Sequence, residues 1–142
     1  MSEPQWVWQC DRVIPGETPA GRRILGEILT ELHDRDWGRH DIFAVHLATE
    51  EALVNAIRHG NRSAPAKQVR IRCGIASQVV RIEIMDDGPG FHPDELPDPT
   101  DSEHLGAPDG RGVLLIRSFM SRVEFRSPGN HVILEKDRNR SE

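Results

Sequence analysis

Two repeating patterns of hydrophobic and polar residues divide the chain into strands and helices. In "QVRIRCGIA" (68–76) and "VVRIEIM" (79–85), apolar residues alternate with mostly charged ones, which is typical of a strand with one buried face. Only Ser77 and Gln78 separate these segments, so we predict a hairpin. The same signals, with turn residues between the segments, predict three further strands at 6–14, 122–127 and 131–136.

Three other segments place apolar residues at the spacing of an α-helix. The first helix is predicted from Thr18, a candidate N-cap, to about Trp37. The second begins after Asp41, another candidate cap, and ends near Gly60. The third, "GVLLIRSFM", covers 112–120.

The resulting order is strand, helix, helix, strand, strand, loop, helix, strand, strand. It predicts one α/β domain over residues 1–142, a two-layer sandwich in which three helices cover one face of a mixed, mostly antiparallel sheet. The loop, about 91–109, holds four prolines and six acidic residues, and a loop of this length is usually a lid or binding loop. The polar tail, about 137–142, is expected to be frayed.

Composition and charge narrow the classes of function. The net charge is −5, and no run of Lys or Arg is long enough to follow a phosphate backbone, which argues against direct nucleic-acid binding. No stretch approaches the roughly 18 apolar residues of a membrane span, and the N-terminal segment lacks the features of a signal peptide. We therefore expect a cytoplasmic protein without a membrane segment.

The cysteines and histidines suggest no metal centre. Cys10 and Cys73 lie far apart in the sequence and form no CxxC pair, so we expect two reduced thiols, one or both of them buried. His40 and His46 are six residues apart on a predicted helix, an awkward spacing for a shared ligand set. We predict no metal site built from protein side chains alone.

The first of three polar clusters lies in "EEALVNAIRHGN". Glu51 and Asn55 are four residues apart on a predicted helix, so they share one face. An amide oxygen is a hard ligand that suits Mg²⁺, which takes the rest of its shell from waters and phosphates. A carboxylate beside it can accept a proton from an attacking hydroxyl. Taken alone, the pair also fits a solvated glutamate and a weak helix former near a helix C-terminus.

The second cluster, Asp86-Asp87-Gly88-Pro89-Gly90, ends a predicted strand. A carboxylate at the buried end of a strand is costly unless a partner compensates for its desolvation. It can accept a hydrogen bond from an exocyclic amine, and glycines let a ligand ring approach the backbone closely. An acidic β-turn is the alternative interpretation.

The third cluster is "DGRGVLLI", in which Gly110 and Gly112 precede a helix. The free amides and the dipole of a helix N-terminus attract phosphate. The segment is neither a GxxxxGK[ST] loop nor a dinucleotide fingerprint, because Leu115 occupies the place of a third glycine. A GxG pattern by itself is a weak signal.

The order of these clusters is more specific than each of them. The chain contains, in this order, an E-x-x-x-N helix, a D-x-G-x-G strand end, a lid and a G-x-G helix start. This order resembles the N, G1 and G2 boxes of the GHKL (Bergerat-fold) ATPases. That superfamily includes the ATP-binding domains of gyrase, Hsp90, histidine kinases and MutL. Within this superfamily, the chain is most similar to the anti-sigma-factor serine kinases of bacterial partner switching. The similarity lies in the segments "EEALVNAIRHGN", "MDDGPGF" and "GRGVLLIRSFMSRVEF". The resemblance covers about residues 10–136.

The resemblance implies roles for the first two clusters. Asp86 matches the aspartate that accepts a hydrogen bond from the adenine amino group, and Gly88 and Gly90 match the glycines that close around the base. Asn55 matches the magnesium ligand and Glu51 the proposed general base.

The third cluster matches the phosphate end of the same site. Gly110 and Gly112 match the glycines at the end of the lid. Arg58, His59 and Arg111 lie near the phosphates by this resemblance, with a solvated surface position as the alternative for each. The lid contains no lysine, which leaves open the cation that reaches the γ-phosphate.

The family resemblance implies a protein serine/threonine kinase that uses ATP and Mg²⁺. Such a kinase phosphorylates a serine of a small antagonist protein, and the unphosphorylated antagonist competes with a sigma factor or another regulator. Glu51 takes the serine proton, and Mg²⁺ on Asn55 neutralises phosphate charge. The family also suggests a homodimer.

Two other interpretations stay open. In the first, the chain is a binding module in which nucleotide only orders the lid and so switches a protein interface. In the second, it is a histidine-kinase catalytic domain. The second is weaker, because no dimerisation helix with an acceptor histidine precedes the motifs and the 142 residues are expected to be complete.

Overall fold

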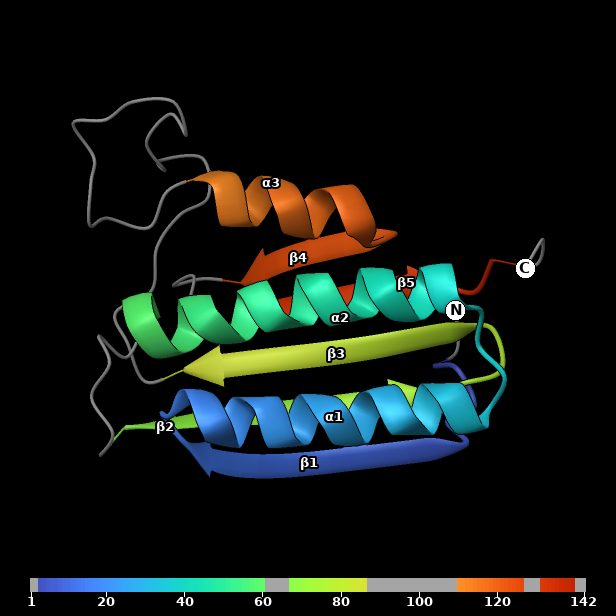
Figure 1. The fold of residues 1–142 in the computed structure, drawn as a ribbon, viewed down its shortest axis with the longest axis horizontal. Helices are drawn as coiled ribbons and strands as arrows, with labels where there is room; N and C mark the ends of the chain where they lie inside the picture. Colours follow the sequence, from blue (N-terminus) through green and yellow to red (C-terminus); the bar gives the residue numbers. More distant parts are fainter. Residues whose placement is uncertain (1–2, 61–66, 87–109, 127–130, 140–142) are drawn as a thin grey trace.

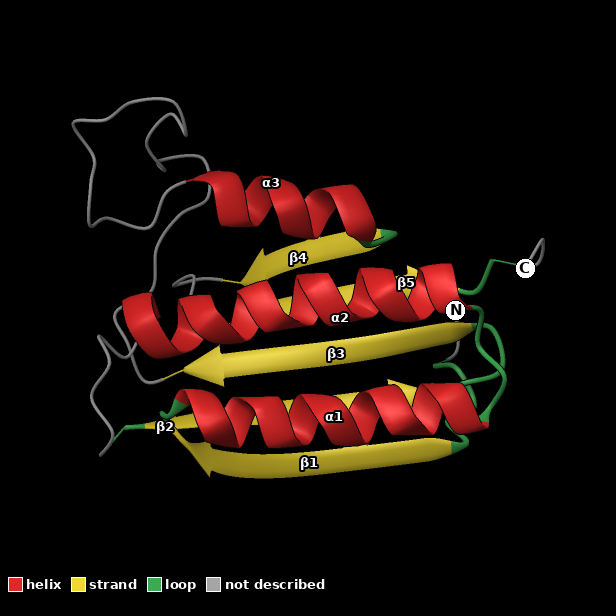
Figure 2. Ribbon diagram, in the orientation of Figure 1, coloured by secondary structure: helices red, strands yellow, loops and turns green. Residues whose placement is uncertain are grey.

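The computed structural model describes residues 3–60, 67–86, 110–126 and 131–139, and its elements confirm the predicted order (Figure 1, Figure 2). The elements are β1 (Trp8–Pro15), α1 (Thr18–Asp34), α2 (Arg39–Val54), the π-helical turn η1 (Asn55–Gly60), β2 (Gln68–Ile75), β3 (Val79–Asp86), α3 (Gly110–Phe119), β4 (Arg122–Arg126) and β5 (His131–Asp137). The predicted lid lies outside the described residues. None of the described helices is long and apolar enough to cross a membrane.

The strands form one sheet in the order β1-β2-β3-β5-β4, and every pairing within the described ranges is antiparallel. The prediction of a mixed sheet is corrected in this respect. α1 and α2 run in opposite directions, so they return the chain to the end of the sheet at which β1 stops (Figure 1). β3 and β4 point the same way, but β5 lies between them.

The three helices cover one face of the sheet, and the hydrophobic core lies between the two layers (Figure 2). Ile28 and Leu32 of α1 and Val45 of α2 are fully buried in it. The buried apolar side chains of β2 and β3 follow the predicted alternation: Val69, Ile71, Cys73, Ile75, Val80, Ile82 and Ile84. Full burial of one large apolar side chain stabilises the fold by about 1.5–3 kcal/mol. This core holds α2 and β3 in a fixed relation.

α1 ends at Asp34, earlier than the predicted end at Trp37. Asp36 adopts a left-handed backbone conformation with φ 60°, which Asp tolerates better than most residues. The N–H of Trp37 then bonds to the carbonyl oxygen of Leu32 (3.1 Å), and the N–H of Asp36 bonds to that of His33 (3.0 Å). These two bonds form a Schellman motif, which satisfies the last carbonyls of the helix and ends it.

The N-terminal caps differ from those predicted. Thr18 is the first helical residue of α1, and Glu17 takes the N-cap position without a side-chain hydrogen bond. In α2, Gly38 is the N-cap residue, so Asp41 lies inside the first turn. Asp41 is buried, and its carboxylate accepts a hydrogen bond from the backbone N–H of Asn139 (2.8 Å). Asp41 therefore anchors the C-terminal segment instead of capping the helix.

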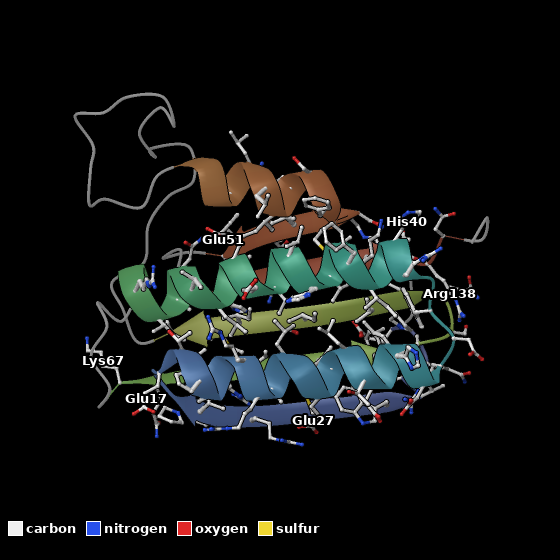
Figure 3. All side chains as sticks on the ribbon, viewed as in Figure 1. Glu17, Glu27, His40, Glu51, Lys67 and Arg138 are labelled. Atoms are coloured by element: carbon white, nitrogen blue, oxygen red, sulfur yellow. The ribbon has the colours of Figure 1, made fainter. Side chains whose placement is uncertain are left out.

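The frayed tail predicted from about residue 137 does not begin there. Beyond β5, the guanidinium of Arg138 donates hydrogen bonds to the carbonyl oxygens of Asp36 (2.7 Å) and Ser77 (3.2 Å). It also lies 5.3 Å from the centre of the Trp37 ring. Figure 3 shows Arg138 at the end of the sandwich where α2 begins. The chain is thus tied to the fold at least as far as residue 139, the last described one of this segment.

The face of the sheet opposite the helices carries ion pairs between strands. Arg81 of β3 donates hydrogen bonds to Glu135 of β5 (2.9 Å) and to Glu3 (2.8 Å). Arg122 of β4 donates to Glu135 (2.9 Å) and to Asp137 (2.6 Å). Because neighbouring strands supply the two signs of charge, these pairs favour the observed register.

We predict a specific pH dependence from this network. Burial opposes the ionisation of Glu135, but hydrogen bonds from Arg122 and Arg81 outweigh it and hold the pKa of that carboxyl below its usual value. A hydrogen bond from Arg122 also lowers the pKa of Asp137. Carboxyls of the unfolded chain titrate at about pH 4. The stabilisation should therefore be present above about pH 4 and be lost as the pH falls below it.

Urea unfolding between about pH 7 and about pH 3 measures this effect. Arg122→Gln should lower the free energy of unfolding at neutral pH and make its decline in acid shallower. Arg126→Gln is the control on the same strand, because the ion pair of Arg126 with Glu124 is exposed on both sides. A change of at most about 0.5 kcal/mol is expected for the control. The same pH profile in both variants would contradict the prediction.

Candidate functional site

One end of the sandwich collects the segments that carry the predicted site residues. α2 and β3 end there and α3 begins there, at the left of Figure 1. η1 continues α2 and packs against β3, and α3 packs along α2. Residues 51–55, 86 and 110–112 are far apart in the sequence, but they lie at the same end of the fold.

The tightest contact at this end joins α2 to α3 at Gly112. A Cβ atom placed on Gly112 would lie 2.6 Å from Oε1 of Glu51 and 3.1 Å from Nδ2 of Asn55. A side chain at residue 112 would have to displace both polar groups, so the backbone of α3 lies close to them. Figure 3 shows Glu51 on the side of α2 that faces α3. Both side chains are half-buried.

The helix geometry changes at Asn55, one turn after Glu51. The N–H of Asn55 bonds to the carbonyl oxygens of Glu51 and Ala52, and from Asn55 to Gly60 the chain forms the wider π-helical turn η1. Single π-helical turns are uncommon and often occur at functional sites. Ile57 is buried and fixes the turn to the core, whereas Arg58 is exposed. The turn therefore holds Asn55 firmly and presents Arg58 to solvent.

Asp86 is the last residue of β3 and is half-buried. It has the same parity along the strand as Ile82 and Ile84, which are buried under the helices, so it belongs to the helix-covered face. It lies opposite Val69 of β2, at the end of the sheet against which η1 packs. The strand thus delivers a carboxylate to the same end as Glu51 and Asn55.

Several predicted site residues are not placed by the structure. Gly88 and Gly90 lie outside the described residues, as do the side chains of His59 and Arg111. Gly110 is the first residue of α3. The described part of the chain therefore brings together Glu51, Asn55, Asp86 and Gly112, and leaves the remaining assignments as predictions.

The N-terminus of α3 suits an anion. The helix spans ten residues, Gly110–Phe119, and has no acidic residue in its first turn. The N–H groups in the first turn of a helix have no partner within the helix, and together with the helix dipole they favour negative charge at this end. Within the described ranges, no group of three His, Cys, Asp or Glu side chains could hold a metal ion. One amide oxygen from Asn55, with phosphate oxygens and waters, matches the way Mg²⁺ is usually bound.

The open face of the sheet contains two hollows within the described residues. These hollows, of about 420 and 570 Å³, share the residues Glu3, Arg72, Arg81 and Glu83 as lining. Arg81 is already neutralised by carboxylates, and these groups lie on the side of the sheet away from Glu51. The types of residue at the α2–α3 end, and not the size of a hollow, therefore identify that end as the candidate site.

The environment of the Thr49 hydroxyl was not predicted. Thr49 of α2 is fully buried, and its hydroxyl has no hydrogen-bond partner among the described residues. The contact of Gly112 with Glu51 was also not predicted, because a GxG pattern does not show which side chain lies above it. For Thr49 the sequence contained one signal, which is a residue with a hydroxyl group at a position where the helical spacing predicts the core.

Comparisons with known proteins found a family and a relative that the chain resembles. Residues 15–136 match the family described as the histidine kinase-like ATPase domain. The chain is 30% identical over 126 residues to the anti-sigma F factor of Oceanobacillus iheyensis, and the match covers 84% of each protein.

A solved structure shows a similar fold. It is the crystal structure of the RsbU and RsbW domains of Rv1364c from Mycobacterium tuberculosis, with a TM-score of 0.61 and 14% sequence identity. The match covers 94% of this chain and 32% of that chain, so this chain spans about a third of its length. At this identity the likeness concerns the fold alone.

Proposed function

The chain belongs to the histidine kinase-like ATPase domain family, and from this premise we propose that it is an ATP-dependent protein serine kinase. One observation carries the proposal: the Glu51 carboxylate and the Asn55 amide lie against the backbone of Gly112 at the start of α3. Phosphoryl transfer needs a proton acceptor, a place for the metal and donors for phosphate oxygens. These groups supply all three within one contact.

The adenine end of the proposed site is formed by β3 and the residues after it. The Asp86 carboxylate accepts a hydrogen bond from the adenine amino group, and its half-buried position strengthens such a bond. Gly88 and Gly90 let the backbone close around the base.

The phosphate end is formed by the start of α3 and by η1. The backbone N–H groups at Gly110 and Gly112 bind phosphate oxygens, helped by the helix dipole. Arg58 is exposed beside this end, and its cation suits the same charge. We assign His59 and Arg111 to the phosphates on the family resemblance alone.

The chemical step is divided between Glu51 and Asn55. Glu51 accepts the proton of the attacking serine hydroxyl, and its position on a helix packed into the core fixes its orientation. The oxygen of Asn55 holds Mg²⁺, which when bound neutralises charge on the phosphates. The acceptor serine comes from another protein.

The partners follow from the relative at 30% identity, which is named an anti-sigma F factor. We propose that the chain binds a sigma factor or a similar regulator and phosphorylates a serine of an antagonist protein, in the cytoplasm. The family resemblance supports a homodimer, and we expect the motifs to work within one domain over residues 1–142.

A second candidate is a binding module that uses the same nucleotide site without chemistry. The observation that favours it is the direct contact between the first turn of α3 and the Glu51–Asn55 pair. Nucleotide bound at this contact displaces or stabilises α3, and a protein surface that includes α3 then changes with it.

The first prediction from the proposed function concerns the binding of adenine. Asp86→Asn should weaken the binding of ADP by roughly 1–3 kcal/mol, because one charged acceptor is lost. Glu83→Gln is the matched control, since Glu83 is on the same strand but on the open face. Calorimetric titration with ADP measures both. If Asp86→Asn binds ADP like the unmodified chain, the adenine contact lies elsewhere.

The second prediction separates chemistry from binding. Glu51→Gln should retain ATP binding but slow phosphoryl transfer by about 10²–10⁴-fold, since an amide cannot accept the serine proton. Asn55→Ala should instead weaken the Mg²⁺-dependent part of ATP affinity. Glu50→Gln, at the neighbouring position of α2, is the control and should transfer phosphate at the normal rate.

Single-turnover assays with candidate antagonist proteins, and ATP titrations with and without Mg²⁺, measure these effects. Normal transfer by Glu51→Gln would show that Glu51 is not the base. A chain that binds Mg-ATP but phosphorylates no serine partner would support the binding module instead.

The third prediction tests the contact at Gly112. A methyl group there would push Oε1 of Glu51 and Nδ2 of Asn55 away, because both lie within 3.1 Å of its position. Gly112→Ala should therefore slow phosphoryl transfer, by about 10²-fold if the base moves by about 1 Å. Its thermal stability should change little, since alanine is favoured over glycine in a helix.

Gly26→Ala provides the control, because nothing lies within 4 Å of its added Cβ. This substitution in α1 should leave transfer unchanged and leave stability equal or slightly higher. Equal transfer rates for both alanine variants would mean that the Gly112 contact does not position Glu51.

A further inference from the structure

The structure places the two cysteines of the chain opposite each other. Cys10 of β1 and Cys73 of β2 are paired residues in the sheet register, although they are far apart in the sequence. Cys73 is buried in the core, and Cys10 is half-buried and packs against it. The expectation of reduced, buried thiols included no relation between them, so this pairing is new information.

The Cα spacing of this pair lies within the range of a disulfide. The N–H of Gly16 bonds to the carbonyl oxygen of Lys67 (2.9 Å), and hydrogen-bonded pairs recur at every second residue of an antiparallel ladder. Cys10 and Cys73 therefore occupy a hydrogen-bonded pair, in which the Cα atoms are about 5.5 Å apart. Disulfides most often span about 5.5–6 Å between Cα atoms. The Cβ atoms of a hydrogen-bonded pair lie near the upper end of about 4.5–5.5 Å, whereas a disulfide needs about 3.5–4.5 Å. The bond therefore requires the edge strand β1 to move toward β2 by about 1 Å.

The two thiols differ in access. Cys10 lies on the edge strand near Arg12 and Glu27, which form an exposed ion pair beside it, whereas Cys73 lies behind it in the sheet. Burial raises the pKa of the Cys10 thiol, and burial together with the negative charge of a Cys10 thiolate raises that of Cys73 well above its ordinary value. Reaction with an oxidant is therefore slow near neutral pH and begins at Cys10.

We infer that Cys10 and Cys73 form a reversible disulfide that ties β1 to β2, with a low-molecular-weight disulfide of the glutathione class as the oxidant. The Cys10 thiolate attacks one sulfur of that disulfide, which releases one thiolate and leaves a mixed disulfide on Cys10. The Cys73 thiolate then attacks the Cys10 sulfur and releases the second thiolate. The two released thiolates take up the two thiol protons, so one disulfide is reduced as the other forms.

The bond would enclose much of the candidate site in a covalent loop. The chain between Cys10 and Cys73 contains α1 and α2, including Glu51 and Asn55. Closing such a loop restricts the unfolded chain and raises thermal stability, unless strain in the folded state offsets the gain. The inference does not depend on the proposed kinase activity.

The test uses the folded full-length chain in a mixture of reduced and oxidised glutathione at about pH 8.5, where more of each thiol is ionised. After quenching with an alkylating agent, mass spectrometry should show the loss of both free thiols. Non-reducing electrophoresis should show a monomer, and dithiothreitol should restore both thiols. In the same glutathione mixture, a chain unfolded in urea should contain a smaller fraction of the disulfide.

Cys10→Ser and Cys73→Ala are the control variants, and each should at most carry one glutathione. The inference is overturned if the folded chain keeps two free thiols, carries glutathione on one cysteine while the other stays free, or forms only disulfides between chains. An equal or larger disulfide fraction in the urea-unfolded chain would also overturn it, because the folded register would then contribute nothing.

Discussion

The close approach of α3 to α2 at Gly112 is the contact on which the candidate site depends. It brings a helix N-terminus against Glu51 and Asn55, which α2 holds one turn apart. A helix start attracts anions, an amide oxygen suits Mg²⁺, and a carboxylate accepts protons. Each group has these properties anywhere in a protein. Here one ligand can reach the helix start, the amide and the carboxylate together, because Gly112 places no side chain between the two helices.

The topology of the sheet makes this contact possible. Because α1 and α2 return the chain to the end where β1 stops, the C-terminal end of α2 and the C-terminal end of β3 lie together. The strict alternation of β3 then decides the face on which Asp86 lies. A shift of one residue would move Asp86 to the open face, among the paired arginines and glutamates. Register therefore positions the site as directly as the helix contact does.

Local patterns predicted most of the fold, and contacts between distant segments account for the errors. The alternation in β2 and β3 and the helical spacing around Glu51 depend on neighbouring residues, so the sequence shows them. Asp41 looked like a cap because its partner, the backbone of Asn139, is at the other end of the chain. The sheet was predicted as mixed and mostly antiparallel, and no local pattern shows that β5 lies between β3 and β4, which makes every described pairing antiparallel. The pairing of Cys10 with Cys73 follows from the same register and was equally out of reach.

The position of Glu51 also bears on the choice between a kinase and a nucleotide-dependent binding module. A binding module needs the Asn55 oxygen, the start of α3 and the Asp86 carboxylate, but it has no use for a proton acceptor. A half-buried carboxylate is costly to desolvate, and the start of α3 offsets part of that cost because its dipole favours negative charge. A glutamine would fill the same space against Gly112 without that cost and without repelling a bound phosphate. Proton transfer therefore gives the carboxylate at residue 51 a use that a binding module does not have.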